Sequence, residues 1–182
     1  GKRVTTNDYG SADYYYVDKS SLPKVYGGFN TSLSWKGFDL SAIFAYSIGG
    51  YIYNRDITMI LHNGSLEGRD WSTEILKRWT PDNRYTDVPA LSTTSNNWNS
   101  ASTRFLQNNS YMRLKNLTLS YNLPKQWISK LSLSSVQVYV QGDNLFTIHR
   151  NQGLDPEQGI TGITYYRYPA MRTISGGINV SF

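Results

Sequence analysis

The stretch YMRLKNLTLSYN, residues 111–122, decides the fold class because its second half alternates strictly between apolar and polar side chains. The apolar positions are Leu117, Leu119 and Tyr121, and the polar positions between them are Asn116, Thr118, Ser120 and Asn122. A period of two residues places alternate side chains on opposite faces of an extended chain. This stretch therefore predicts a β-strand with one apolar and one polar face.

Four further stretches show the same period, at about residues 25–35, 38–47, 136–146 and 174–182. Two of the connections between the five strands are short. Lys36-Gly37 predicts a tight hairpin turn, and Pro124 suits the start of a brief helix in the link to the fourth strand. The other two connections, residues 48–110 and 147–172, are much longer. The pattern predicts an all-β antiparallel sheet with short turns at one end and long loops at the other.

The composition supports a β protein and excludes several kinds of site. The 182 residues include 15 Tyr and only 17% charged residues, which is unlike a helical bundle. With no Cys and only two His, far apart at His62 and His149, the chain offers no thiolate or His-based metal site, so no cofactor is expected. The 18 basic residues are scattered rather than clustered, so nucleic acid is not an expected partner.

No arrangement of residues points to catalysis. Asp39, Asp143 and Asp155 fall on separate predicted elements, and no Ser stands in a G-x-S-x-G motif. The sequence therefore predicts a protein that is not an enzyme.

The alternation leaves two architectures open. In a transmembrane β-barrel the apolar faces contact lipid, whereas in a soluble carbohydrate-binding β-sandwich a second sheet covers them. In a barrel, the residues expected to face hydrocarbon are Leu33, Leu40, Phe44, Leu117, Leu119, Val138, Val140, Ile178 and Val180. Those expected to face the lumen are Asn30, Ser41, Thr118, Ser120, Gln141 and Asn179. The few charges on the polar faces, and aromatics near the strand ends, are typical of a barrel, but the pattern alone leaves both architectures open.

Several blocks in constant order resemble the SusC/RagA family of TonB-dependent outer-membrane transporters of Bacteroidetes. They are YMRLKNLTLSYNLP at residues 111–124, VQVYVQGDNLFT at 136–147, LDPE at 154–157 and YPAMRTISGGINVSF at 168–182. Residues 26–53 resemble the family's K-G-F-D-L hairpin, with a Gly-Gly pair after its second strand.

The resemblance implies that residues 1–182 are the C-terminal part of a large barrel, without its plug and N-terminal strands. It implies import of oligosaccharides or peptides together with a SusD-like surface lipoprotein, with force from a TonB complex reaching the protein through a missing N-terminal part. It places the C-terminus in the periplasm and the long loops outside the cell. Phe182 resembles the terminal aromatic that marks barrel proteins for outer-membrane assembly.

Aromatic residues in the two long connections are candidates for substrate binding, because flat rings with polar rims suit sugar rings and peptide side chains. The candidates are Trp71, Trp79, Trp98, Tyr165 and Tyr166. The spacing of Trp71, Ile75 and Trp79 predicts a helix that Asp70 caps and Pro81 ends. These rings are equally suited to packing the loops against one another or against a partner protein.

Overall fold

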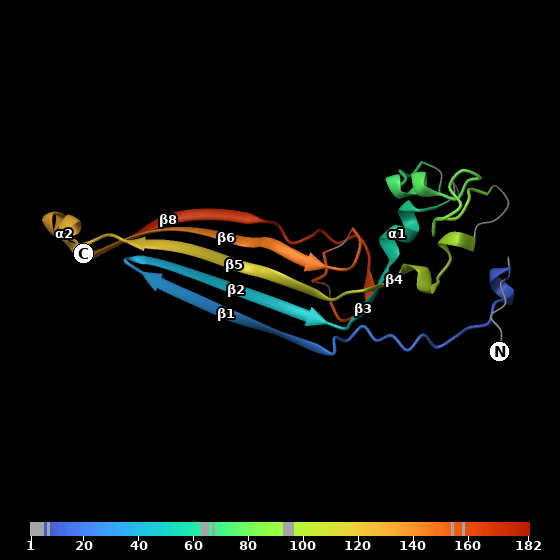
Figure 1. The fold of residues 1–182 in the computed structure, drawn as a ribbon, viewed down its shortest axis with the longest axis horizontal. Coiled ribbons are helices and arrows are strands. Elements are labelled where there is room, and N and C mark those ends of the chain that lie inside the picture. The colour runs from blue at the N-terminus through green and yellow to red at the C-terminus, as the bar shows by residue number, and fades with distance from the viewer. Residues whose placement is uncertain are drawn as a thin grey trace.

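The fold is described from a computed structural model at residues 6, 8–62, 66, 68–92, 97–153, 155–157 and 159–182. Five long strands form one antiparallel sheet in the order β1-β2-β5-β6-β8 (Figure 1). Their bounds are β1 Val25–Trp35, β2 Phe38–Ile48, β5 Tyr111–Asn122, β6 Ser135–His149 and β8 Thr173–Ser181. The five predicted strands are confirmed, with ends shifted by three residues at most.

The short connections lie together at one end of the sheet, here called the turn end (Figure 1). Lys36 and Gly37 both have positive φ, 47° and 87°, which matches the two-residue hairpin turn that suits the twist of the strands. The link between β5 and β6 contains the short helix α2, Lys125–Ile128, which begins directly after Pro124 as predicted. A one-turn 3-10 helix, η5 Ser129–Leu131, follows it.

The register of the sheet separates apolar from polar side chains. Leu33 pairs with Leu40, Leu40 with Leu119 and Leu119 with Val140, so these side chains share one face across four strands. This is the apolar face, and it holds all nine residues that the sequence predicted for hydrocarbon. The polar face, which includes the pair Thr118 and Gln141, holds all six residues predicted for the lumen. The division into two faces is confirmed.

The apolar face is open along its length. Leu33 is 66% exposed, Leu119 42% and Val140 47%. The smaller second sheet lies beyond the opposite, loop end of the long strands rather than over them (Figure 1). Within the described residues, nothing packs on these leucines as the second layer of a β-sandwich would, so the sandwich prediction is wrong for this chain.

A chain of side-chain hydrogen bonds crosses all five strands on the polar face near the turn end. The Ser34 hydroxyl donates to Asp39, and the Asn122 amide donates to the other Asp39 oxygen at 2.7 Å. Gln137 then donates to Asn122 at 3.1 Å and accepts from Asn179 at 3.2 Å. Polar side chains on this face therefore satisfy one another across neighbouring strands.

A β-bulge interrupts β5 at Lys115, which the alternation did not predict. Leu114 pairs with Phe44 and Asn116 with Ile43, so Lys115 has no opposite residue on β2. An extra residue resets the alternation, and Met112 and Leu114 consequently join the apolar face on the other side of the bulge. Arg113, between them, lies on the polar face.

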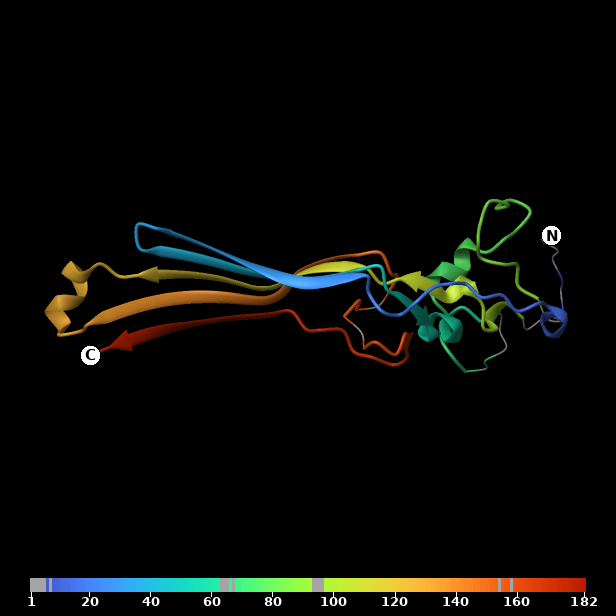
Figure 2. The ribbon, with the colours of Figure 1, turned by 90° about the horizontal axis from the view of Figure 1, so that it is seen from below.

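The loop end carries short elements that the sequence did not predict (Figures 1 and 2). A second sheet has the order β4-β3-β7, with β3 Tyr51–Asn54, β4 Leu106–Asn108 and β7 Ile163–Thr164. The helix α1, Arg55–Ile60, follows β3 directly. Three 3-10 helices lie nearby, η1 Tyr9–Ser11, η3 Asn97–Asn99 and η4 Thr103–Phe105. Ile52 and Phe105 are nearly fully buried here and form a small core.

The predicted helix over Trp71 to Trp79 is wrong in type and extent. The structure has a 3-10 helix, η2 Thr73–Lys77, in which the Ser72 side chain rather than Asp70 caps the N-terminus. Only Ile75 of the expected apolar face is buried, while Trp71 and Trp79 lie outside the helix and remain partly exposed. The Ser72 hydroxyl accepts the backbone N–H of Glu74, so the helix begins after Ser72, two residues later than the predicted cap at Asp70.

None of the helices in the described part of the chain is long and apolar enough to cross a membrane.

Candidate functional site

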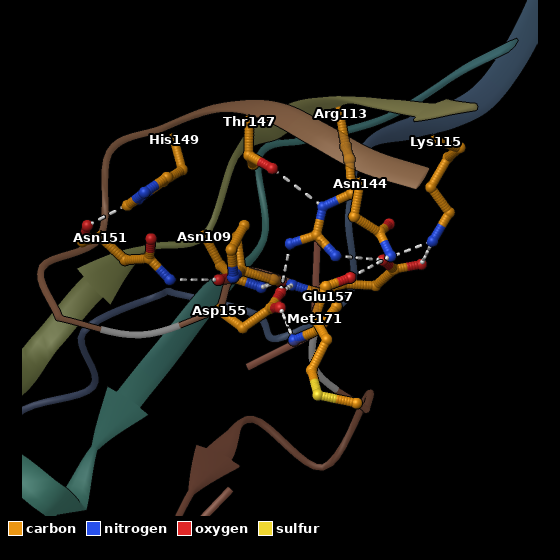
Figure 3. Close-up of polar contacts among 12 residues, drawn as sticks. Asn109, Arg113, Lys115, Asn144, Thr147, His149, Asn151, Asp155, Glu157 and Met171 are labelled. Atoms are coloured by element: carbon orange, nitrogen blue, oxygen red, sulfur yellow. Dashed lines mark hydrogen bonds and ion pairs between the residues drawn. The ribbon is translucent and has the colours of Figure 1, made fainter. Parts of the chain in front are cut away.

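A buried polar cluster lies on the polar face at the loop end and centres on Arg113 of β5. The Arg113 side chain is 4% exposed, and its guanidinium contacts three different groups (Figure 3). Nη2 is 2.5 Å from Asp155 Oδ1, Nη1 is 2.8 Å from Glu157 Oε2, and Nε donates to the Thr147 hydroxyl of β6 at 3.0 Å. A buried guanidinium therefore joins two strands to the loop that follows β6.

Asp155 is held from several directions. Besides the ion pair with Arg113, its Oδ1 accepts the backbone N–H of Glu157 at 2.9 Å and its Oδ2 accepts that of Ala170 at 2.6 Å. The carboxylate thus joins both ends of residues 155–170, and its side chain is 7% exposed. Glu157 is less buried and shares its charge between Arg113 and Lys115, whose Nζ lies 2.7 Å away. The bulge that displaced Lys115 from the pairing makes this contact possible.

Amide side chains complete the attachment of residues 151–172, here called the anchored loop. Asn109 donates to the Pro156 carbonyl at 2.8 Å, and Asn151 donates to Asn109 at 3.1 Å. Asn144 of β6, which lies at the register shift opposite Lys115 and has a φ of 53°, donates to the Met171 carbonyl at 3.1 Å. These contacts hold the anchored loop against the polar face (Figure 3).

The anchored loop is expected to loosen in acid. Burial raises the pKa of Asp155, but hydrogen bonds from Ala170, Arg113 and Glu157 together with the Arg113 charge outweigh it, and the pKa lies below its usual range. A depressed carboxylate pKa contributes stability above the unfolded value of about 3.9, and this contribution is lost as the pH falls through the folded pKa. Hydrogen-exchange protection of the Ala170 amide, corrected for the intrinsic rate, should therefore fall below about pH 4.

Two comparisons check the acid effect. The Leu123 amide, which donates to the Val136 carbonyl at 2.9 Å, involves no carboxylate and should keep its protection. In an Asp155→Asn variant the Ala170 amide should be poorly protected at every pH, because the neutral amide lacks the charge that Arg113 requires. Unchanged Ala170 protection in the wild type between pH 6 and pH 3 would contradict the role of Asp155.

The predicted loop aromatics are brought together only in part. The rings of Tyr165 and Tyr166 lie 4.1 Å apart between centroids, directly after β7. Trp71 packs edge-on against the buried His62 at 5.4 Å, and Trp79 donates its backbone N–H to Val88. Within the described residues, no ring contact joins either tryptophan to the tyrosine pair.

Two further predicted residues are placed as follows. Trp98 lies in η3, but its side chain is outside the described part of the structure. Phe182 follows the end of β8 with an exposed side chain.

A groove also opens at the loop end. Its volume is about 1030 Å³, and its walls come from the N-terminal segment, β3 and the region of η4. The aromatic residues that line it are Tyr9, Tyr14, Tyr15, Tyr16 and Tyr53. The rings offer stacking faces and hydroxyls together, which suits binding rather than bond cleavage.

Sequence reasoning missed the Arg113 cluster. The sequence did contain a signal for an ion pair. Arg113 lies between Met112 and Leu114 in a strand whose other charged residue is Lys115, and the LDPE stretch offers two carboxylates as partners. Among the described residues, no group of three or more His, Asp or Glu is placed to hold a metal ion. The contacts of Arg113 with Asp155 and Glu157 make the cluster an ionic attachment for the loop.

No family model matches the chain, but it is similar to curated and solved proteins. It is 34% identical over 166 residues to TonB-dependent receptor P3 of Formosa agariphila, covering 85% of this chain and 16% of that protein. It is 27% identical over 168 residues to TonB-dependent receptor SusC of Bacteroides thetaiotaomicron, covering 92% and 16%. A chain of the RagAB peptide importer in its closed-closed state matches with a TM-score of 0.84 and 36% identity, over 98% of this chain and 19% of that one. The chain thus spans less than a fifth of the length of each of these proteins.

Proposed function

The chain belongs to the SusC/RagA family of TonB-dependent receptors, and from this we propose that it forms part of the wall of an outer-membrane β-barrel that imports oligosaccharides or peptides. It makes and breaks no bond in this role. The importer's plug and remaining strands would complete the barrel, and TonB would supply force through another part of the protein.

The single observation that carries the proposal is the continuous apolar face of the five-stranded sheet. Side chains on this face remain exposed on every strand, while the polar face is joined by hydrogen bonds. A soluble surface would gain nothing from such a face, whereas lipid hydrocarbon would solvate it. The two edge strands, β1 and β8, have unpaired outer edges that neighbouring strands of a closed barrel would satisfy.

The asymmetry of the connections supports an orientation. Outer-membrane barrels have short turns on the periplasmic side and long loops outside the cell. The turn end, with Lys36-Gly37 and α2, would then face the periplasm together with the C-terminus. The anchored loop and the tyrosine-lined groove would lie at the outer mouth, where a SusD-like lipoprotein would contact them.

The loop aromatics are the proposed contacts to substrate or lipoprotein. Tyr165, Tyr166, Trp71 and Trp79 are all partly exposed at the loop end. The solved relative RagAB is a peptide importer, which supports a peptide as one class of substrate.

A test combines membrane location with uptake, using the full-length receptor in its native host. The receptor should fractionate with the outer membrane and migrate faster on unheated than on heated gels, as folded barrels do. Deleting its gene should abolish growth on at least one oligosaccharide or peptide from a defined panel, and a proton uncoupler should stop uptake of that compound. A receptor found in the soluble fraction, or uptake that survives the deletion, would contradict the proposal.

A further inference from the structure

Two arginines and two tyrosines meet at the loop end outside the Arg113 cluster, and the parallel pairing of β3 with β7 brings them together. Asn54 pairs with Thr164, and both are fully buried. Arg55 follows Asn54 and Tyr165 follows Thr164, so the two segments leave the paired position side by side. The Arg55 guanidinium carbon lies 4.7 Å from the centre of the Tyr165 ring, within the range of a cation–π contact.

The second arginine comes from the loop after α1. Arg69 Nη1 lies 3.3 Å from the hydroxyl oxygen of Tyr166, whose ring packs against that of Tyr165. Tyr165 is 42% exposed and Tyr166 63%, and both arginines are exposed. The four side chains therefore form a continuous surface of two rings flanked by two positive charges.

The charge of this surface is not balanced within it. Arg113 has two carboxylate partners, but in the described part of the chain neither Arg55 nor Arg69 forms a salt bridge. Asp56 contributes a carboxylate to the cluster, and its Oδ1 accepts the backbone N–H of Tyr166 at 3.0 Å. Arg55, Arg69 and Asp56, the charged side chains placed in this cluster by the described contacts, carry a net positive charge together.

The backbone at Tyr166 is strained. Its φ of 48° is in the left-handed region, which a bulky residue adopts only when its surroundings impose it. The bond to Asp56 and the β3–β7 pairing impose it here, and such strain is typical of functional sites. The positive charge of the cluster also acts on Tyr166, because the hydrogen bond from Arg69 lowers the pKa of the Tyr166 phenol.

We propose that Arg55, Arg69, Tyr165 and Tyr166 form a binding site for a carboxylate group on the imported substrate. The two guanidinium groups would donate charge-assisted hydrogen bonds to the carboxylate, and the rings would pack against the apolar part that carries it. Acidic peptides and uronic-acid oligosaccharides both present this chemistry. The inference rests on the proposed import function and narrows its substrate class.

The test measures binding to the purified full-length receptor in detergent. Two probe pairs each compare a carboxylate with a neutral derivative: a fluorescent, C-terminally amidated pentapeptide with a central Glu or Gln, and tri-galacturonate or its methyl ester. In at least one pair the acid form should bind about tenfold more tightly, and raising NaCl from 50 to 500 mM should shrink this preference. The double variant Arg55→Gln/Arg69→Gln should bind both members of that pair equally.

Arg84→Gln serves as the matched control, because Arg84 is also exposed in a loop and donates to the Pro81 carbonyl rather than to a tyrosine. It should keep the wild-type preference. A preference in the peptide pair or in the glycan pair identifies the source of the carboxylate. Equal affinity in both pairs, or a preference that survives in the double variant, overturns the inference. Gel migration of the same preparation separates the two proposals, because an intact barrel without preference contradicts this inference alone, whereas a missing barrel contradicts the proposed function.

Discussion

Replacing Arg113 by alanine is expected to release the anchored loop from the polar face while leaving the sheet intact. Removing one partner of a buried ion pair costs about 3–5 kcal/mol when the other partner stays buried. Here Asp155 can avoid that cost, because a detached loop carries its carboxylate into water. The amides of Glu157 and Ala170 should therefore lose at least about a hundredfold of hydrogen-exchange protection, equivalent to about 3 kcal/mol.

Lys115→Ala provides the matched control for this prediction. Lys115 pairs with Glu157 at 2.7 Å, but both side chains are more than a third exposed, and such pairs contribute at most about 1 kcal/mol. Loop protection should therefore change less than tenfold. Adding Asp155→Ala to Arg113→Ala should cost little more than the first change alone, because the two side chains act as one unit. Equal effects of Arg113→Ala and Lys115→Ala would show that burial does not decide the attachment.

The long strands could be predicted from the sequence because their pattern is repeated and local. Each has nine or more residues and shows a period of two over at least half of its length. Pairs between neighbouring strands, such as Leu40 with Leu119, place these side chains on the same two faces. The bulge at Lys115 was not predicted, although two successive polar residues, Lys115 and Asn116, interrupt the alternation there. The bulge decides the site, because it places Arg113 on the polar face and Lys115 near Glu157.

The loop end was beyond prediction for a different reason. β7 has two residues and β4 has three, so neither is long enough to show a period. Their pairing depends on contacts between segments more than fifty residues apart, such as Tyr53 with Leu106. The tyrosine pair was proposed because its residues are aromatic and lie in a long connection. Arg55 was placed beside it only by the β3–β7 register, and Arg69 only by the contact of the loop after α1 with Tyr166.

Replacing Leu119 by arginine is expected to destabilise the folded barrel by about 2–4 kcal/mol, if Leu119 lies near the midplane of the bilayer. Its paired neighbours, Leu40 and Val140, are apolar and offer no partner for a guanidinium. Thr118→Arg should cost much less, because Thr118 pairs with Ser41 and Gln141 on the polar face, where an arginine can reach water and acceptors. Urea unfolding of the full-length receptor in lipid vesicles measures both changes.

A third variant, Leu119→Ala, separates charge from lost side-chain volume. In a packed core this change leaves a cavity, but lipid chains can fill the space left at a lipid-facing position, so only the transfer free energy of the removed methyl groups is lost. Leu119→Ala should therefore destabilise less than Leu119→Arg. If Thr118→Arg proved the more damaging arginine, the polar face would point to the lipid and the assignment would be inverted. Since a shift of one residue exchanges the two faces of a strand, this single comparison fixes the facing of all five strands through their shared register.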